Sequence, residues 1–95
     1  MAKGDAKASI SAAVANNGFM TIQPPAGEEW CILKILYEGS VELYFTDGTT
    51  DVLFDSDTGA GHLLDKIPIT NTHYLKVKNV SGAAQDLGYS GYQTK

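Results

Sequence analysis

Residues 41–55 read VELYFTDGTTDVLFD, and they carry the clearest indication of secondary structure in the chain. Val41, Leu43 and Phe45 alternate with more polar residues, which is the period of a strand that shows one apolar face. A second alternating run follows the turn, from Val52 to Asp55. An Asp-Gly pair between two such runs is a strong short-range indication of a β-hairpin. The stretch therefore predicts two antiparallel strands.

The rest of the chain from Phe19 onward repeats the pattern in short apolar runs that Gly, Pro, Asn and Asp interrupt. Further strands are expected at Phe19–Gln23, Trp30–Tyr37, Ile67–Thr70, His73–Val80 and Gln85–Gln93. Residues 56–61 are expected to form a loop, with Leu63 and Leu64 anchoring its far end. About six to eight short strands without an interior helix predict an all-β antiparallel sandwich of jelly-roll type.

The run from Trp30 to Tyr37 is the densest apolar segment, and Lys34 is its only charged residue. Simple alternation gives two apolar rows, namely Trp30, Ile32 and Leu36 on one face and Cys31, Leu33 and Ile35 on the other. A strand with two apolar faces is expected to be covered on both sides. We therefore expect the opposing sheet on one side and another subunit, or the N-terminal segment, on the other.

Residues 1–18 differ from the rest because they are rich in Ala, Ser and Asn. Ala6–Ala15 has a weak helical propensity, whereas Ser9–Ser11 and Val14 suit an extended strand at a sheet edge. We interpret residues 1–18 as an N-terminal arm that orders against a neighbour, and a frayed terminus is the alternative. Residues 19–95 are then expected to form one β-sandwich domain.

Composition limits the classes of function. No apolar stretch approaches the roughly 20 residues that span a bilayer, and the short, serine-interrupted run after Lys7 is not typical of a signal peptide. The chain has no arginine, and residues 28–65 carry a net charge of −8 against +3 for residues 66–95. Because nucleic-acid binding depends on clustered positive charge, we expect no nucleic-acid partner. Because no apolar stretch is long enough to span a bilayer, we also expect no membrane partner. Opposite charges on different segments suit either solvated strand faces or contacts between copies.

Three arrangements were weighed as chemical sites. The Asp55–Gly59 segment resembles the start of a calcium loop, but Ala60 and Lys66 stand where that loop requires Gly and Glu. His62 and His73 are separated by eleven positions and lack a neighbouring carboxylate, which disfavours a metal centre. Cys31 is the only cysteine and has no histidine partner in the sequence nearby, so a buried thiol is expected. The sequence predicts no catalytic residues, no cofactor and no metal.

Tyrosine is enriched at protein interfaces because its ring buries area while its hydroxyl keeps a polar partner. The five tyrosines therefore suit subunit contacts or a platform for sugars, although ordinary cross-strand packing explains them as well. Adding the apolar surplus of the arm and of the Trp30 run gives a set of candidate interface residues. They are Ile10, Val14, Trp30, Ile32, Tyr37, Tyr44, Tyr74 and Tyr92.

Three segments carry a resemblance to a known class of proteins. They are Ile22–Trp30 (IQPPAGEEW), Asn71–Asn79 (NTHYLKVKN) and Gly88–Gln93 (GYSGYQ). A Pro-Ala-Gly turn before a Trp-headed strand, an Asn-Thr-aromatic strand and a Gly-Tyr-Ser-Gly end resemble small virion proteins of tailed bacteriophages that decorate or cement a capsid. The resemblance covers residues 19–95, and it carries over no individual binding residues.

The resemblance implies a non-enzymatic structural protein that binds the outside of the capsid, with the major capsid protein as partner. We expect a homo-oligomer, with a trimer favoured, located on the virion surface after assembly in the host cytoplasm. One alternative is a receptor- or glycan-binding module of a tail or fibre that uses Tyr44, Tyr74 and residues 56–61. Another is a small sugar-active or metal-dependent β-barrel enzyme, which the absence of an acid pair and of a ligand cluster disfavours.

Overall fold

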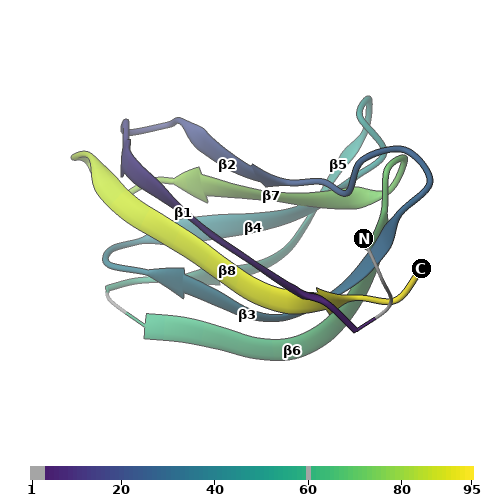
Figure 1. The fold of residues 1–95 in the computed structure, drawn as a ribbon. Coiled ribbons are helices and arrows are strands. Elements are labelled where there is room, and N and C mark those ends of the chain that lie inside the picture. The colour runs from purple at the N-terminus through teal and green to yellow at the C-terminus, as the bar shows by residue number, and fades with distance from the viewer. Residues whose placement is uncertain (1–3, 60) are drawn as a thin grey trace.

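The computed structural model describes residues 4–59 and 61–95, and for residues 62–65 it describes only the course of the backbone. These residues form eight strands and no helix. The strands are β1 (Ala6–Val14), β2 (Phe19–Ile22), β3 (Glu29–Tyr37), β4 (Val41–Thr46), β5 (Asp51–Asp57), β6 (Gly61–Thr70), β7 (Tyr74–Asn79) and β8 (Gln85–Gln93). One four-stranded sheet has the order β1-β8-β3-β6 and the other has the order β2-β7-β4-β5 (Figure 1).

The strand pairing is nested around the hairpin of residues 41–57. β4 pairs with β5, β3 with β6, β2 with β7 and β1 with β8, all antiparallel. Additional pairs, β3 with β8 and β4 with β7, complete the two sheets. A long folded hairpin of this kind is the topology of the jelly roll, whose eight strands form two Greek keys. The structure thereby confirms the predicted all-β sandwich, and the Asp-Gly hairpin is its innermost unit.

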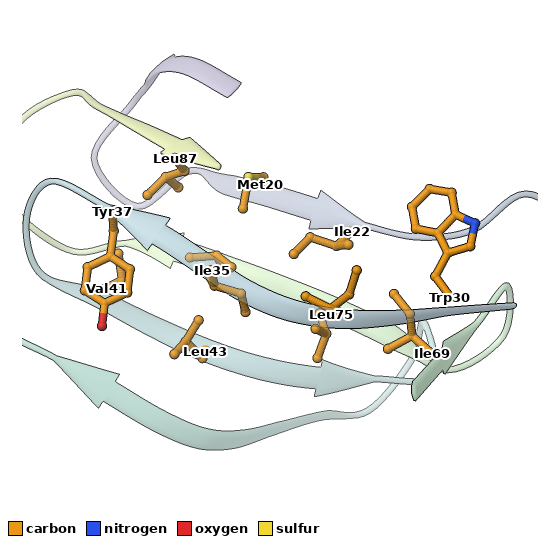
Figure 2. Packing of buried hydrophobic residues seen from close by; sticks show 12 residues of the cluster. Met20, Ile22, Trp30, Ile35, Tyr37, Val41, Leu43, Ile69, Leu75 and Leu87 are labelled. Carbon is orange, nitrogen blue, oxygen red and sulfur yellow. The ribbon is translucent and has the colours of Figure 1, made fainter. Parts of the chain in front are cut away.

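The core lies between the two sheets and takes side chains from both (Figure 2). Its largest fully buried members are apolar and include Ile22, Ile32, Ile35, Leu43, Ile69, Leu75 and Leu87. Strand β7 shows the clean alternation that one buried face requires, since Leu75 and Val77 are buried between half-buried neighbours. Burying such side chains is the main source of stability, at roughly 25 cal/mol per Å² of apolar surface.

A β-bulge in β3 corrects the expected facing of the Trp30 run. The register of β3 against both β6 and β8 shifts between Ile32 and Lys34. Because an extra residue reverses the alternation, Trp30 and Ile32 face the core before the bulge, and Ile35 and Tyr37 face it afterwards. The two expected rows, Trp30, Ile32 and Leu36 against Cys31, Leu33 and Ile35, are therefore wrong. Leu33 and Leu36 are 36% and 42% exposed although Cys31 is buried, so the single chain covers the second face of β3 only in part. Cover by another subunit stays a prediction.

Gly91 permits this bulge. A Cβ at Gly91 would collide with the backbone oxygen of Cys31 and lie 2.9 Å from Ile32 Cα. Real Cβ atoms do not approach that closely, and the obstacle is backbone that cannot rotate away. The close approach of β8 to the bulge in the neighbouring strand therefore requires glycine at this position.

Residues 6–14 are an integral part of the sandwich. β1 pairs with β8 from Ala6 to Ser11, and its register shifts before Val14, where Ala13 adopts a φ of 52°. Val14 packs against the core. Residues 6–14 are thus not helical, and they pair with β8 of the same chain. The expected boundary at residue 18 lies in the turn between β1 and β2.

Two other boundaries also differ from expectation. Strand β5 continues through Ser56 and Asp57, which were expected in a loop, and β6 begins at Gly61 instead of Ile67. The two strands lie in different sheets, so the chain changes sheets after Asp57 and before Gly61. Within the described residues, no helix is long and apolar enough to cross a membrane.

Candidate interaction surfaces

The described side chains contain no group of three or more His, Cys, Asp or Glu that could hold a metal ion. His73 is exposed and stacks on Phe45, with ring centroids 6.2 Å apart, while the His62 side chain lies outside the described part of the structure. Cys31 is a buried free thiol. The phenol of Tyr92 hydrogen-bonds to this thiol, and that bond raises the pKa of Tyr92 above its ordinary value. The candidate sites described below are exposed surfaces of the domain.

The candidate interface residues fall into three groups by exposure, namely buried, exposed and half-buried. Trp30, Ile32 and Tyr37 lie in the core of this chain and are not available to a partner while the domain stays folded. The other side chains are partly or fully accessible: Ile10 is 76% exposed, and Val14, Tyr44, Tyr74 and Tyr92 are half-buried. Alternation alone could not separate the groups because the bulge in β3 changes which residues face inward.

The outer face of the β2-β7-β4-β5 sheet carries an aromatic–lysine face, which we define as Phe19, Tyr44, Lys76 and Lys78. Phe19 is 43% exposed and meets the Tyr44 ring edge-on at 6.3 Å between centroids. The Lys76 ammonium lies 4.4 Å and the Lys78 ammonium 6.0 Å from the centre of the Phe19 ring. Cations at these distances are attracted to the ring face. The arrangement fixes an exposed aromatic ring between two positive charges.

Carboxylates complete this face. The Tyr44 hydroxyl donates to Glu42 Oε1 at 2.7 Å, and this hydrogen bond raises the pKa of Tyr44. Lys76 Nζ lies 3.0 Å from Asp51 Oδ2. Hydrogen bonds from Thr46 and then from Lys76 hold the pKa of Asp51 below its usual range. The face thus combines aromatic rings with polar groups, a combination that is enriched at protein interfaces.

Strand β5 is exposed along its whole length. Its three consecutive apolar residues, Val52, Leu53 and Phe54, are 56%, 52% and 40% exposed. Runs of large apolar side chains in solvent are uncommon on soluble monomers and mark contact surfaces. Sequence alternation had placed Val52 and Phe54 in the hairpin but gave no sign that both faces of β5 lie in solvent.

The end of β5 is tied to β3 across the sandwich. The Tyr37 hydroxyl donates to Asp57 Oδ2 at 2.6 Å. Burial, followed by this hydrogen bond to a carboxylate, raises the pKa of Tyr37 to about 12. The same hydrogen bond is the largest cause that lowers the pKa of Asp57. The hydrogen bond between Tyr37 and Asp57 therefore holds the end of the exposed strand β5 in place.

A second apolar surface lies on the outer face of the β1-β8-β3-β6 sheet. Ile10 from β1 and Leu36 from β3 border a shallow groove of about 240 Å³. Gly88 of β8 forms its floor, since a Cβ there would lie 3.7 Å from Ile10 and 3.8 Å from Leu36. Ile10 was among the candidate interface residues, whereas Leu36 was expected to be covered and Gly88 was not singled out. Leu36 faces outward because of the bulge in β3, and no residue type in that strand predicts the bulge.

No protein-family model matches the chain, and no curated protein matches it. Among solved structures, the fold is similar to part of the capsular polysaccharide assembling protein CapF from Staphylococcus aureus. The TM-score is 0.50 at 14% sequence identity, over 98% of this chain. The chain spans 25% of the length of that protein. At this identity the similarity concerns the fold alone.

Proposed function

We propose that this protein is a non-enzymatic structural protein of a tailed-bacteriophage virion that binds and stabilises the outside of the capsid. The observation that carries the proposal is the number of large apolar side chains that stay exposed although the domain has a buried core. The exposed large apolar residues are Ile10, Phe19, Leu33, Leu36, Val52, Leu53 and Phe54. They lie on the outer sheet faces and on edge strands, where a partner can reach them.

The fold supports this proposal by analogy. Jelly rolls occur in viral capsid proteins, lectins and cupins, so the architecture is compatible with a virion component but does not select it. The placement in a phage rests on the resemblance of Ile22–Trp30, Asn71–Asn79 and Gly88–Gln93 to decoration modules. The major capsid protein is accordingly the proposed partner, and the virion surface is the proposed location.

The mechanism is the bridging of neighbouring capsid subunits. A rigid two-sheet module with apolar patches on separate faces can contact two subunits at once. Each contact of a few hundred Å² adds only a few kcal/mol, at roughly 25 cal/mol per Å² before association costs. Repetition around a closed shell makes the sum large, because opening the shell must break many contacts together.

Melting of phage particles with and without the protein tests this proposal. Stripped particles should open at a lower temperature than complete ones and should resist low salt less well, and adding back the purified protein should restore the resistance. A variant with both Leu53 and Phe54 replaced by Ser, which alters exposed residues only, should restore it less. Identical melting of complete and stripped particles would count against the proposal.

A receptor- or glycan-binding module is the second candidate, and the aromatic–lysine face favours it. The ring of Phe19 is exposed beside Tyr44, Glu42 and Asp51, which together offer stacking and hydrogen bonds on one surface. Tyr74 lies nearer the Asp47-Gly48 turn, and its hydroxyl would be 3.5 Å from a Cβ at Gly48. A glycan array should distinguish the candidates: hits that Phe19→Ala abolishes would support glycan binding, and the absence of hits would remove it.

A further inference from the structure

Sheet edges are the natural sites of association in an antiparallel sandwich, and three of the four edges here carry features that oppose pairing. Strand β2 has only four residues and is followed by Pro24-Pro25. Strand β5 carries Asp51, Asp55 and Asp57 and has an irregular register. Strand β6 contains Pro68, which lacks an N–H group. Short strands, charges, bulges and prolines are the means by which natural proteins prevent edge-to-edge association.

Strand β1 lacks these protections from Ala6 to Ser11, since its one register shift lies beyond Ser11, near the end of the strand. It has nine residues and no proline, and Lys7 is its only charged residue. Lys7 does not guard the edge, because its ammonium lies 5.4 Å from the centre of the Trp30 ring and 3.7 Å from Glu28 Oε1. The side chains on the outer face of β1 are small except for Ile10.

The hydrogen bonds to β8 define which backbone groups of β1 face the open edge. The N–H of Gln93 donates to the carbonyl of Asp5 at 2.9 Å, next to a turn at Gly4 with a φ of 84°. In an antiparallel pair, alternate residues exchange both hydrogen bonds with the same neighbour. The odd-numbered residues of β1 therefore bond to β8. The even-numbered residues, Ala6, Ala8, Ile10 and Ala12, direct their N–H and C=O groups away from it.

We propose that β1 pairs antiparallel with β1 of a second copy of this chain, around a two-fold axis at Ser9. Ser9 is the midpoint of the four edge-facing residues, and Ala13 with its φ of 52° ends the regular strand beyond them. In this register Ala8 lies opposite Ile10 of the second copy, and no charged residue opposes a like charge. The N–H and C=O groups that face the edge then bond to one another, and the two sheets join into one of eight strands.

The same pairing covers the outer apolar groove. Ile10 is the most exposed large apolar side chain among the described residues, at 76%, and it borders the groove with Leu36. Across the two-fold axis the two Ile10 side chains become diagonal neighbours, which lie within contact distance for long side chains. The dimer would thus bury the apolar surface nearest to the edge. This inference does not depend on the proposed capsid function and differs from the trimer expected from the sequence.

Cysteine cross-linking tests the register directly. In the Cys31→Ala background, Ser9→Cys should give a disulfide-linked dimer under mild oxidation, since residues opposite one another at such a position have Cα atoms about 4.5 Å apart. Ser11→Cys is the matched control, because the two copies of residue 11 would lie roughly 14 Å apart. Equal cross-linking of both variants, or of neither, would overturn the proposal.

Solution mass provides the second test, on purified protein without phage particles. The wild-type chain should have twice the 10.1 kDa of one chain, and Ile10→Lys should convert it to a monomer. Val52→Lys places the same charge at a similarly exposed position on the opposite edge strand and should leave the dimer intact. Circular dichroism should show that both variants stay folded. A wild-type monomer or trimer, or a dimer that Ile10→Lys leaves unchanged, would contradict the proposal, whereas particle melting would still test the capsid function separately.

Discussion

Gln85 Nε2 donates a hydrogen bond of 2.7 Å to Oδ1 of Asn79, and the two side chains together close one end of the sandwich. Asn79 is fully buried, its Oδ1 also accepts from Ser81, and its Nδ2 donates to the carbonyls of Val14 and Ala83. Gln85 Oε1 accepts from the backbone N–H groups of Glu38 and Gly39. One buried pair therefore connects the ends of β1, β3, β7 and β8.

Replacement of Asn79 should destabilise the domain strongly. Asn79→Ala leaves several buried polar groups without partners, and we expect a loss of about 3 kcal/mol in the free energy of unfolding. Asn71→Ala is the matched control, since Asn71 is half-buried and its side chain donates to the carbonyl of Pro24 at 3.1 Å. Its loss should stay below about 1 kcal/mol. Urea unfolding measures both, and equal losses would contradict the assigned role of Asn79.

Gly91→Ala should disrupt the pairing of β8 with β3 at the bulge. The added Cβ meets backbone of Cys31 and Ile32, so β8 or β3 must shift, at a cost of about 3 kcal/mol or more. Gly61→Ala is the comparison, because the nearest atoms to a Cβ there lie 3.5 Å away, an ordinary contact distance. Thermal unfolding should separate the two variants by many degrees. A tolerated Gly91→Ala would show that the bulge is placed incorrectly.

Tyr37 should make stability fall at high pH. Its pKa is raised from 10.0 to about 12 in the folded state, mainly by burial, so the unfolded chain loses this proton more readily than the folded one. The stabilisation is complete below pH 10 and is lost as the pH rises from 10 towards 12. Tyr37→Phe removes the titrating group, and its stability should decline less over that interval. Parallel curves for both proteins in urea unfolding at several pH values would disprove this assignment.

Alanine substitutions at two neighbouring residues of β2 should lower the stability of the domain by very different amounts. Met20 is buried and Phe19 is exposed on the aromatic–lysine face. Met20→Ala should cost about 3 kcal/mol, because it leaves a cavity in the core. Phe19→Ala should cost about 1 kcal/mol or less, since it removes only surface contacts with Tyr44 and Lys76. Comparable losses in chemical unfolding would mean that β2 faces the other way.

The sequence allowed the elements with clean alternation to be predicted. Val41–Asp55 gave the hairpin, Gln85–Gln93 gave β8 with its observed bounds, and Leu75 and Val77 marked the inner face of β7. In β4 and β7 buried residues alternate with half-buried ones along most of the strand, which is the condition under which a period of two is visible in sequence. Strand β5 is exposed along its whole length, and the Asp-Gly turn was the signal that placed it in the hairpin.

The rest depended on long-range packing. The bulge in β3 depends on the approach of Gly91, which lies 57 positions after Lys34 and 59 after Ile32 in the chain. Nothing local to β3 signals it. β1 lacks an apolar pattern because its residues are small, so its pairing with β8 was one of several possibilities. Asn79 resembled an ordinary residue before a turn, and only the tertiary structure shows that it is buried and bonded on all sides.

Binding of the purified protein to phage heads that lack it tests the proposed function most directly. Co-sedimentation with heads should saturate at a fixed ratio to the major capsid protein, tails should bind none, and a Leu53→Ser, Phe54→Ser variant should bind more weakly. Absence of binding to heads from any phage whose genome encodes this chain, or equal binding to tails, would contradict the account.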